Sequence, residues 1–568
     1  MLMFMALLVP LLPLVTALIV VVGSHSTRHD RAKIAAWPIG AAFCGAMVTL
    51  YLVATEGPIA LRLYDPASAA SFAVPLGLYV DRLTAVMMVL ISGVGTIIYR
   101  YSVGNMYQDP HERRYLALIG FTTFVLLCMV SSANLVMLFV FWQFLSYLLY
   151  LLAHNHTHAA TLAGAFRTFT LLRVGDIAFL AGIVLTHQLY GTLEFPDLFA
   201  KATEARVTWS PLFGWKIDGA TAVTLLLFIG GMTKSAQFPL HAWLPQYLYG
   251  PTPVTALLHA GIINAGGFLI NRLAPLFGLS STTLHIAFVV GTMTAILGAF
   301  MMLAQNDIKK TLGFSTIAQM GYMIMECGLG AFSLAVFHLI AHGLFKATVF
   351  LNCGSVIHKS RREPHFPHTD PQEEEQEFSR LTWITGFATT LMIPLLILLV
   401  THGMLRIPLL ESQGTVIFLF FIWITSSQAI LTLTRLRAVA SWKVSAAMLL
   451  TLLFVVFVYL FAVESFTEFL YPDPEVVASY FQAAALPGWL FDLMILMATA
   501  LTVLGWCYLY MRAHGRTMWT PAWIEGLRIR LYVLFLNRLY VDELYQLIGQ
   551  NMMRLIHRLD KRGQGWSQ

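Results

Sequence analysis

Charge is scarce in this sequence. Only 11% of its 568 residues are charged, whereas 58% are hydrophobic and the mean hydropathy is +0.71. A soluble domain of this size needs a far more polar surface, so the composition excludes that class and predicts a polytopic membrane protein. The net charge of +6 does not indicate nucleic-acid binding, because the basic residues lie in short loops between apolar runs, as in cytoplasmic loops of membrane proteins.

Cysteine is also rare. The five cysteines lie in apolar segments and form no CxxC pair: Cys44, Cys128, Cys327, Cys353 and Cys507. Their number and spacing exclude a disulfide framework and a zinc knuckle. No pattern that binds flavin, nicotinamide, quinone or an iron–sulfur cluster is recognisable. We therefore expect no cofactor, no metal site and no catalytic chemistry in this chain.

Apolar runs are abundant. About fifteen are long enough to cross about 30 Å of hydrocarbon, at residues 3–23, 36–55, 78–101, 114–131, 133–153, 166–188, 221–247, 251–274, 284–304, 308–328, 330–358, 381–402, 414–435, 442–463 and 489–511. The predicted fold is an all-α polytopic membrane protein with a transmembrane domain over residues 1–511. Residues 512–568 form a tail with apolar residues at helical spacing and arginines between them, which predicts an amphipathic helix on the membrane surface or on a partner.

The basic residues fix a predicted orientation. With the N-terminus outside, the inner loops hold most of the lysines and arginines, including Arg28, Arg31, Lys33, Arg113, Arg114, Lys309, Lys310, Lys359, Arg361 and Arg362. The outer loops hold few. The positive-inside rule therefore predicts an outer N-terminus and a cytoplasmic C-terminus. The inner loop 359–380 is either a solvated linker or a docking site for a partner, and the tail offers a further surface.

The stretch from Met232 to Lys346 carries ionisable residues within or at the ends of apolar runs. They are Lys234, His241, His259, Lys309, His338, His342 and Lys346. An ionisable group at the bilayer centre costs several kcal/mol by insertion scales and usually faces a bundle interior or a water-filled path. So many in one stretch predict a route for protons or other cations.

Lys234 precedes Pro239 and Pro245, which remove backbone donors and predict a broken helix. Since a desolvated lysine gives up its proton readily, Lys234 suits a relay; the alternative is a fixed counter-charge. His259, on the next apolar run, is a second relay candidate or a satisfied core histidine. His241, in the break itself, is a weaker candidate.

His338, His342 and Lys346 are spaced i, i+4 and i+8, so they share one face of a helix. Histidine exchanges protons near neutral pH, which favours a proton relay. Two histidines at i and i+4 also suit zinc, but no third ligand is obvious nearby. Lys309 belongs to the preceding run, and Glu326 lies near the end of that run.

Asp176 and Arg173 lie one turn apart in the run 166–188. They can neutralise each other. Asp176 is also the nearest acidic candidate to compensate the charge of Lys234.

The chain contains four characteristic segments, KSAQFPLHAWLP, GPTPVTALLHA, DIKKTLGFSTIAQMGYM and HLIAHGLFKATVFL. These segments resemble the antiporter-like, proton-translocating subunits of respiratory complex I (the NuoL type), membrane hydrogenases and multisubunit antiporters. The resemblance runs from Val80 to His358, and NRLYVDELY in the tail is similar to the same family. It implies the antiporter-like fold, with Lys234 as the broken-helix lysine and His259 as the following histidine. It also implies relay roles for Lys309, His338, His342 and Lys346.

The chain departs from that family at two places. The fifth span of the family carries a Trp-Glu pair whose glutamate partners the lysine, whereas this chain has Trp142 and Gln143. The second lysine-bearing broken helix has no counterpart, because the runs 381–402 and 414–435 contain no lysine.

A narrower resemblance accounts for both departures. LLHAGIINAGGFLINRLAPLF and QMGYMIMECGLGAF are similar to the DabB proteins, membrane subunits of bacterial two-component inorganic-carbon accumulation complexes. It implies a location in the bacterial inner membrane. It also implies a cytoplasmic partner of the DabA type, similar to a zinc β-carbonic anhydrase, which holds the zinc and is energised by cation flow through this chain. The ion, H⁺ or Na⁺, stays open.

Three functions are therefore weighed. The first is a cation-conducting, proton-conducting by preference, subunit of a complex for uptake of CO₂ or bicarbonate. The second is a proton-pumping subunit of complex I or a membrane hydrogenase. The third is a membrane anchor that conducts nothing, in which the buried charges are structural. Membrane lipids are expected contacts of all three, and nucleic acid of none.

Overall fold

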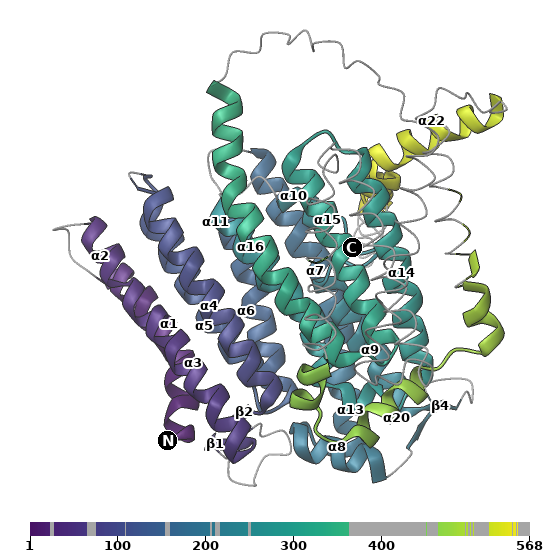
Figure 1. The fold of residues 1–568 in the computed structure, drawn as a ribbon, viewed down its shortest axis with the longest axis horizontal. Helices are drawn as coiled ribbons and strands as arrows, with labels where there is room; N and C mark the ends of the chain where they lie inside the picture. The colour runs from purple at the N-terminus through teal and green to yellow at the C-terminus, as the bar shows by residue number, and fades with distance from the viewer. Residues whose placement is uncertain are drawn as a thin grey trace, which may run out of the picture.

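The computed structural model describes residues 1–22, 28–64, 75–107, 109–153, 159–204, 207–210, 216–247, 252–362, 464–494 and 522–547, with isolated residues beyond. The described part is a bundle of long helices that run side by side (Figure 1). The predicted spans 381–402, 414–435 and 442–463 lie outside the described residues, and so does most of 489–511.

The first part of the bundle consists of simple hydrophobic helices. They are α1 (Leu2–Val22), the short α2 (Arg28–Ile34), α3 (Ala36–Glu56), α4 (Arg82–Asn105), α5 (Glu112–Val130), α6 (Leu135–Ala153) and α7 (Ala159–Tyr190). Helical backbone pairs most of its own polar groups, as a chain in hydrocarbon requires, although Pro10 and Pro13 remove two donors within α1. Successive helices alternate in direction, since the links between them are short.

The second part contains the interrupted helices. It comprises α8 (Phe195–Glu204), α9 (Gly219–Lys234), α10 (Leu244–Tyr247), α11 (Thr252–Ala260), η1 (Ile262–Asn264), α12 (Ala265–Arg272), α13 (Ala274–Phe277), α14 (Ser281–Ala304), α15 (Ile308–Gly328) and α16 (Phe332–Arg362). The helices α20 (Pro474–Ala484) and α22 (Ala522–Leu536) and the turn η3 (Arg538–Tyr540) follow.

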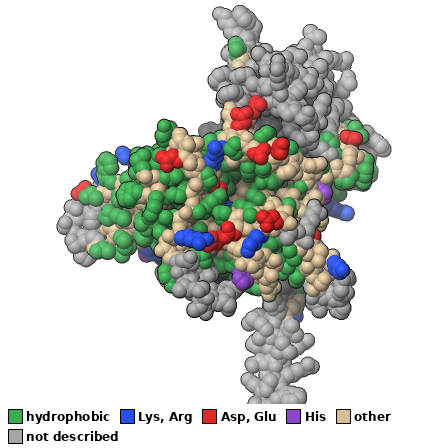
Figure 2. Space-filling model, turned by 90° about the horizontal axis from the view of Figure 1, so that it is seen from below, with side chains coloured by type: hydrophobic (Ala, Val, Ile, Leu, Met, Phe, Trp, Pro, Cys, Tyr) green, Lys and Arg blue, Asp and Glu red, His purple; other side chains and the backbone are tan. Residues whose placement is uncertain are grey.

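The bundle has two ends, which we name by their contents. The hairpin face carries Met1, the antiparallel strands β1 (Ile59–Tyr64) and β2 (Leu76–Val80), α8, α20 and the short strands β3 (Thr208–Trp209) and β4 (Ile217–Asp218). The tail face carries α10 and α22 at the other end (Figure 1). Figure 2 looks onto the hairpin face, where acidic and basic side chains are mixed among apolar ones.

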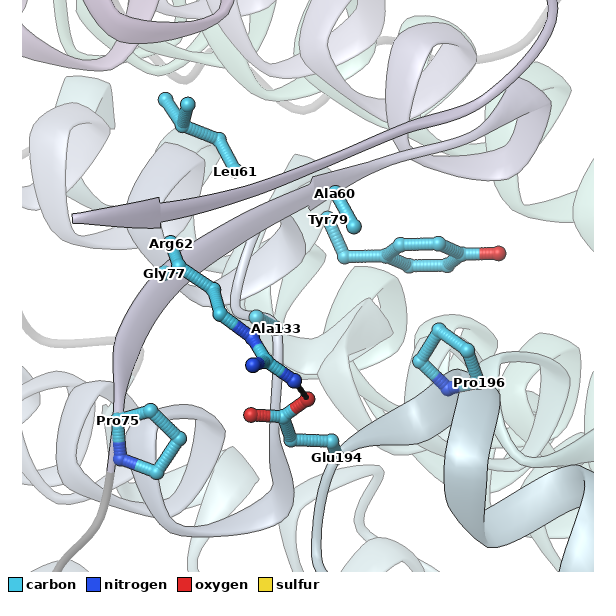
Figure 3. Close-up of a pocket in the computed structure, with 9 residues that line it drawn as sticks. All are labelled: Ala60, Leu61, Arg62, Pro75, Gly77, Tyr79, Ala133, Glu194 and Pro196. Atoms are coloured by element: carbon cyan, nitrogen blue, oxygen red, sulfur yellow. Dashed lines mark hydrogen bonds and ion pairs between the residues drawn. The ribbon is translucent and has the colours of Figure 1, made fainter. Parts of the chain in front are cut away.

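The two small sheets were not foreseen from hydropathy, because they lie in links between spans. The β1–β2 hairpin is fastened to the link before α8 by an ion pair between Arg62 Nη2 and Glu194 Oε2 at 2.8 Å (Figure 3). Gly77 of β2 is enclosed there, since a Cβ at its position would lie 2.6 Å from the carbonyl oxygen of Leu61. The hairpin thus closes one side of the hairpin face.

The predicted spans before residue 362 agree with the structure. Among the described residues, nine helices are long and apolar enough to cross a membrane. Two further spans are the shorter apolar α9 and the less apolar α15. Hydrophobicity thus predicts these helices well, and it fails to show where they are interrupted.

Glycines bring α14 and α15 into backbone contact. A Cβ on Gly291 would lie 2.4 Å from the amide nitrogen of Met325, and one on Gly321 would lie 2.4 Å from that of Ala295. Small residues at such crossings let membrane helices approach closely and gain dispersion contacts. This tight pair forms one wall around the site described next.

Candidate functional site

Helix α9 ends at Lys234 in the interior of the bundle. The residues after it turn without forming a helix until α10, with Ala236 at a φ of 50°. Freed backbone groups are satisfied locally, because the Trp243 indole donates to the Thr233 carbonyl at 3.0 Å and Gln237 N donates to Met232 O at 2.8 Å. The broken helix predicted from Pro239 is therefore present, and it leaves Lys234 only 1% exposed.

Neutral oxygens receive the Lys234 ammonium. Its Nζ donates to Ser146 Oγ at 2.5 Å and to the Trp142 carbonyl at 3.1 Å, and it lies 4.9 Å from the centre of the Trp142 ring. Such contacts hold a cation less firmly than an ion pair does, because a carboxylate is the stronger acceptor. The site therefore binds the lysine without a direct counter-ion.

The nearest acid reaches Lys234 through Trp142. The Trp142 indole donates to Asp176 Oδ1 at 2.9 Å, and Asp176 Oδ2 forms an ion pair with Arg173 at 2.8 Å. Arg173 also donates to the amide oxygen of Gln143. Asp176 thus pairs with Arg173 and also lies within electrostatic reach of Lys234, whose compensation by Asp176 stays a prediction.

A second interrupted helix crosses beside the first. The run 251–274, expected as one helix, is α11, the 3₁₀ turn η1 and α12, with the interruption after His259. Ser235 Oγ, next to Lys234, donates to the carbonyl oxygen of Ile263 in η1 at 2.7 Å. A Cβ on Gly266 would lie 2.1 Å from the Gly231 carbonyl, so α9 and α12 touch backbone to backbone.

His259 lies at the end of α11 and is fully buried. Its ring stacks on Phe350 of α16 with centroids 4.3 Å apart, and neither ring nitrogen has a hydrogen-bond partner among the described residues. His342 of α16 is likewise buried with both ring nitrogens unsatisfied in the described structure.

The expected stripe on α16 exists and faces α15. Lys346 Nζ donates to Ser315 Oγ at 3.0 Å and to the Leu312 carbonyl at 3.3 Å. At the other end of the stripe, His338 Nδ1 lies 3.0 Å from Glu326 Oε2, and its Nε2 lies 2.9 Å from Gln319 Oε1.

Residues of α11 and α16 meet at these charges. His259 is within electrostatic reach of both Lys346 and His342. Gly343 allows this, because a Cβ there would lie 3.0 Å from the Ala260 carbonyl. We call the set Asp176, Lys234, His259, His342, Lys346, His338 and Glu326 the buried polar row.

Lys309 and His241 lie at the margins of the row. Lys309 is in the first turn of α15 at the tail face, one turn before Leu312, which receives Lys346. His241 is 1% exposed in the break after α9 and stacks on Phe238 with centroids 5.5 Å apart. The tail reaches the same break, since Tyr545 Oη donates to the Pro239 carbonyl.

Sequence reasoning missed the polar side chains that receive the charges. They are Ser146, Ser315 and Gln319, together with the indole of Trp142. Serine and glutamine are unremarkable in a hydropathy profile, and Trp142 was noticed only for its neighbour Gln143. The i+4 relation of Trp142 to Ser146 was the one available signal.

A metal was considered for the histidine pair on α16. His338 and His342 have ring centroids 6.3 Å apart, and Glu326 contacts His338. Within the ranges that the structure describes, no group of three or more histidine, cysteine, aspartate or glutamate residues is arranged to hold a metal ion. The arrangement suits groups that exchange protons or stabilise a passing charge.

The fold is that of a multi-pass membrane subunit whose interrupted helices carry buried lysines and histidines. Residues 132–432 match the family model described as NADH:quinone oxidoreductase/Mrp antiporter, TM, and residues 67–116 match that of complex I chain 5, N-terminus. The chain belongs to this antiporter-like family.

Individual relatives narrow the position of this chain within the family. The chain is 38% identical, over 95% of both chains, to the "Probable inorganic carbon transporter subunit DabB1" of Halothiobacillus neapolitanus. It is 37% identical to NADH-quinone oxidoreductase subunit L of Neisseria meningitidis over 55% of this chain, which covers 46% of that protein. Against such complex I subunits it therefore matches about half of the relative's length.

Solved structures share the fold. An archaeal membrane-bound sulfane sulfur reductase aligns over 85% of this chain and 99% of its own, with a TM-score of 0.56 and 17% identity. The Mrp complex from Dietzia sp. DQ12-45-1b aligns over 98% of this chain and 60% of its own, with a TM-score of 0.55 and 22% identity. The chain is thus an antiporter-like multi-pass membrane subunit related to both DabB and subunit L.

Proposed function

We propose that this chain conducts cations, namely protons, along the buried polar row, and that the flow energises uptake of inorganic carbon. A cytoplasmic partner of the DabA type, holding zinc in a site similar to that of a β-carbonic anhydrase, would convert CO₂ to bicarbonate. The observation that carries the proposal is Lys234, fully buried at a helix break and held by neutral oxygens. The full-length likeness to DabB1 points to carbon uptake rather than to redox-driven pumping.

The chemistry of the row favours protons. Lysine and histidine can each release and regain a proton, and in the row they occur on α9, α11 and α16. The carboxylates are already engaged, Asp176 with Arg173 and Glu326 with His338.

The energy available is sufficient. Moving one charge across a membrane releases about 2.3 kcal/mol per 100 mV. Since a factor of ten in an equilibrium is about 1.4 kcal/mol, one proton at that potential biases CO₂ hydration by more than tenfold. Coupling one inward proton to one hydration step would therefore make uptake directional.

The test is growth of a carbonic-anhydrase-deficient bacterium in air. Expression of this chain with its partner should restore growth, and a protonophore should stop the uptake of labelled inorganic carbon. Neither protein alone should restore growth. The proposal is wrong if this chain rescues growth without the partner, or if uptake continues after both proton and sodium gradients have been collapsed.

A redox-driven proton pump is the second candidate, favoured by the likeness to subunit L. It would require a run of redox subunits encoded beside this chain, whereas the first proposal requires a large zinc-site protein there. Gln143 distinguishes the two candidate mechanisms, because its neutral amide stands where complex I subunits are expected to have an acidic partner for the lysine. A non-conducting anchor would tolerate loss of Lys234.

A further inference from the structure

At the hairpin face, the polar row ends beneath a segment that crosses the bundle. Glu326 and Cys327 occupy the last turn of α15, and Asn271 and Arg272 occupy the last turn of α12. Cys327 Sγ accepts from Asn271 Nδ2 at 3.6 Å, so these two turns touch. Residues 464–486, which include α20, lie over them, and we call this segment the strap (Figure 1).

The strap is fastened to several turns of the bundle. Arg82, at the start of α4, donates to the Phe469 carbonyl at 2.7 Å and lies over the Phe469 ring at 5.5 Å. Ser333 and Thr467 share a hydrogen bond of 2.8 Å between their hydroxyls. Further along, His285 Nε2 lies 3.2 Å from the Ala485 carbonyl.

Tyr480 closes the centre of the strap against the bundle. It is 6% exposed, and its ring packs edge-on against Phe332 with centroids 5.0 Å apart. Gly330, at a φ of +75°, passes so close that a Cβ would lie 2.4 Å from the Tyr480 carbonyl. Only glycine fits this turn between α15 and α16, because other residues would be strained and would displace the strap.

Arg272 forms the floor of the same region. It is 3% exposed and donates two hydrogen bonds to the Asp81 carboxylate, from Nη1 to Oδ2 at 2.7 Å and from Nη2 to Oδ1 at 3.1 Å. It also donates to Thr84 and is surrounded by the rings of Tyr79, Phe195 and Phe268. A buried guanidinium held in this way is a fixed positive charge between the row and the hairpin face.

Tyr471 of the strap sits between the floor and the end of the row. Its ring packs against Tyr480 with centroids 5.8 Å apart, and it contacts the main hydrophobic core. Its backbone amide donates to the Thr467 carbonyl at 2.8 Å, and Thr467 bonds to Ser333 in the first turn of α16, so Tyr471 lies beside the turn between α15 and α16.

We propose that Tyr471 is the gate of the row at the hairpin face: its ring seals Cys327, the residue after Glu326, from water, and the strap must lift for an ion to pass. This inference rests on the proposed ion path, because a gate has no meaning in a chain that conducts nothing. The seal itself is a structural property and can be measured apart from transport.

Cys327 is a built-in reporter, because it is fully buried beneath the strap. In a chain whose other cysteines are replaced by alanine, a membrane-impermeant maleimide is added to sealed cells, and labelling of Cys327 is followed over time. We expect slow labelling with Tyr471 present and at least about tenfold faster labelling in Tyr471→Ala, since the thiol reacts only when the cover opens. Tyr471→Phe keeps the ring and should stay protected.

Two controls make the outcome decisive. Ser479→Ala changes an exposed residue of α20 and should leave the labelling rate unchanged. If Tyr471→Ala fails to fold, Arg82→Gln loosens the strap without removing a buried ring and should accelerate labelling in the same direction.

Rapid labelling of Cys327 with Tyr471 present would overturn the inference. So would continued protection in a correctly folded Tyr471→Ala or Arg82→Gln chain. If labelling behaves as expected but carbon uptake is absent, the proposed function fails while the seal stands. If uptake is present and Cys327 is unprotected, only the gate is wrong.

Discussion

At the scale of single residues, the unusual feature is that an acid compensates the positive charge of Lys234 indirectly, through a tryptophan. Lys234 touches Trp142 and Ser146, and the negative charge of Asp176 reaches it across the Trp142 indole. An indole N–H polarises toward the carboxylate it serves, so the ring passes on part of that charge. Gln143 cannot replace this contribution, since its amide carries no charge.

Asp176→Asn is therefore expected to be much more damaging than Gln143→Ala. Asparagine can still accept from Trp142 but leaves Arg173 and Lys234 without a nearby negative charge. We expect carbon uptake to fall by about tenfold or more in Asp176→Asn, equivalent to about 1.4 kcal/mol. Gln143→Ala removes one neutral acceptor from Arg173 and should change uptake by about twofold at most.

Uptake is measured at matched membrane levels of each variant. Equal and mild effects of the two substitutions would show that Asp176 does not compensate Lys234. A loss of membrane-inserted protein confined to Asp176→Asn would instead assign the residue a folding role through Arg173.

At the scale of elements, two interrupted helices meet at their breaks. Ser235 after α9 bonds to η1, and Gly266 of α12 lies against Gly231 of α9. Close backbone contact fixes the position of Lys234 relative to His259, because neither helix can shift along the other without a clash. The geometry of the row therefore depends on a glycine that carries no functional group.

Gly266→Val tests this dependence. The new side chain would meet the Gly231 carbonyl and Ser235 Oγ, and overpacking of this kind costs about 1–3 kcal/mol. We expect a lower unfolding temperature in detergent and loss of uptake. Gly104→Ala is the matched control, because a Cβ there meets nothing within 4 Å. Unchanged stability and uptake in Gly266→Val would contradict the tight crossing.

The helices could be predicted from sequence, whereas most contacts could not. Hydropathy placed the spans up to α16, and Pro239 predicted the break after Lys234, since proline removes a backbone donor. The break after His259 has no proline within it, only Gly261, and glycine alone does not stop a helix. The i+4 stripe of α16 was readable because helical periodicity is fixed, but its partners Ser315 and Gln319 depend on packing.

At the scale of the whole molecule, the two ends of the buried polar row differ in what lies next to them. Toward the tail face it reaches Lys346 and Lys309, and the tail itself touches the break after Lys234 through Tyr545. Toward the hairpin face it ends under the strap at Glu326 and His338. A partner bound at the tail face could therefore sense or alter the site through the tail.

Tyr545→Phe tests the link between the tail and the site. The substitution removes only the hydroxyl that donates to Pro239. If the tail couples partner and row, Tyr545→Phe should reduce uptake by several-fold, about the effect of one lost hydrogen bond, with the partner still bound. Tyr532→Phe, on the exposed part of α22, is the control. Equal uptake in the two variants would remove the tail from the coupling.

The central claim is that charge moves through the row by way of Lys234. The most direct measurement is proton flux into liposomes that contain this chain with its zinc partner, driven by an imposed membrane potential and read with a pH-sensitive dye. We expect flux with Lys234 present, none above background in Lys234→Ala, and normal flux in Lys201→Ala, which changes an exposed lysine of α8. Equal flux with and without Lys234, at equal protein content, would contradict the account.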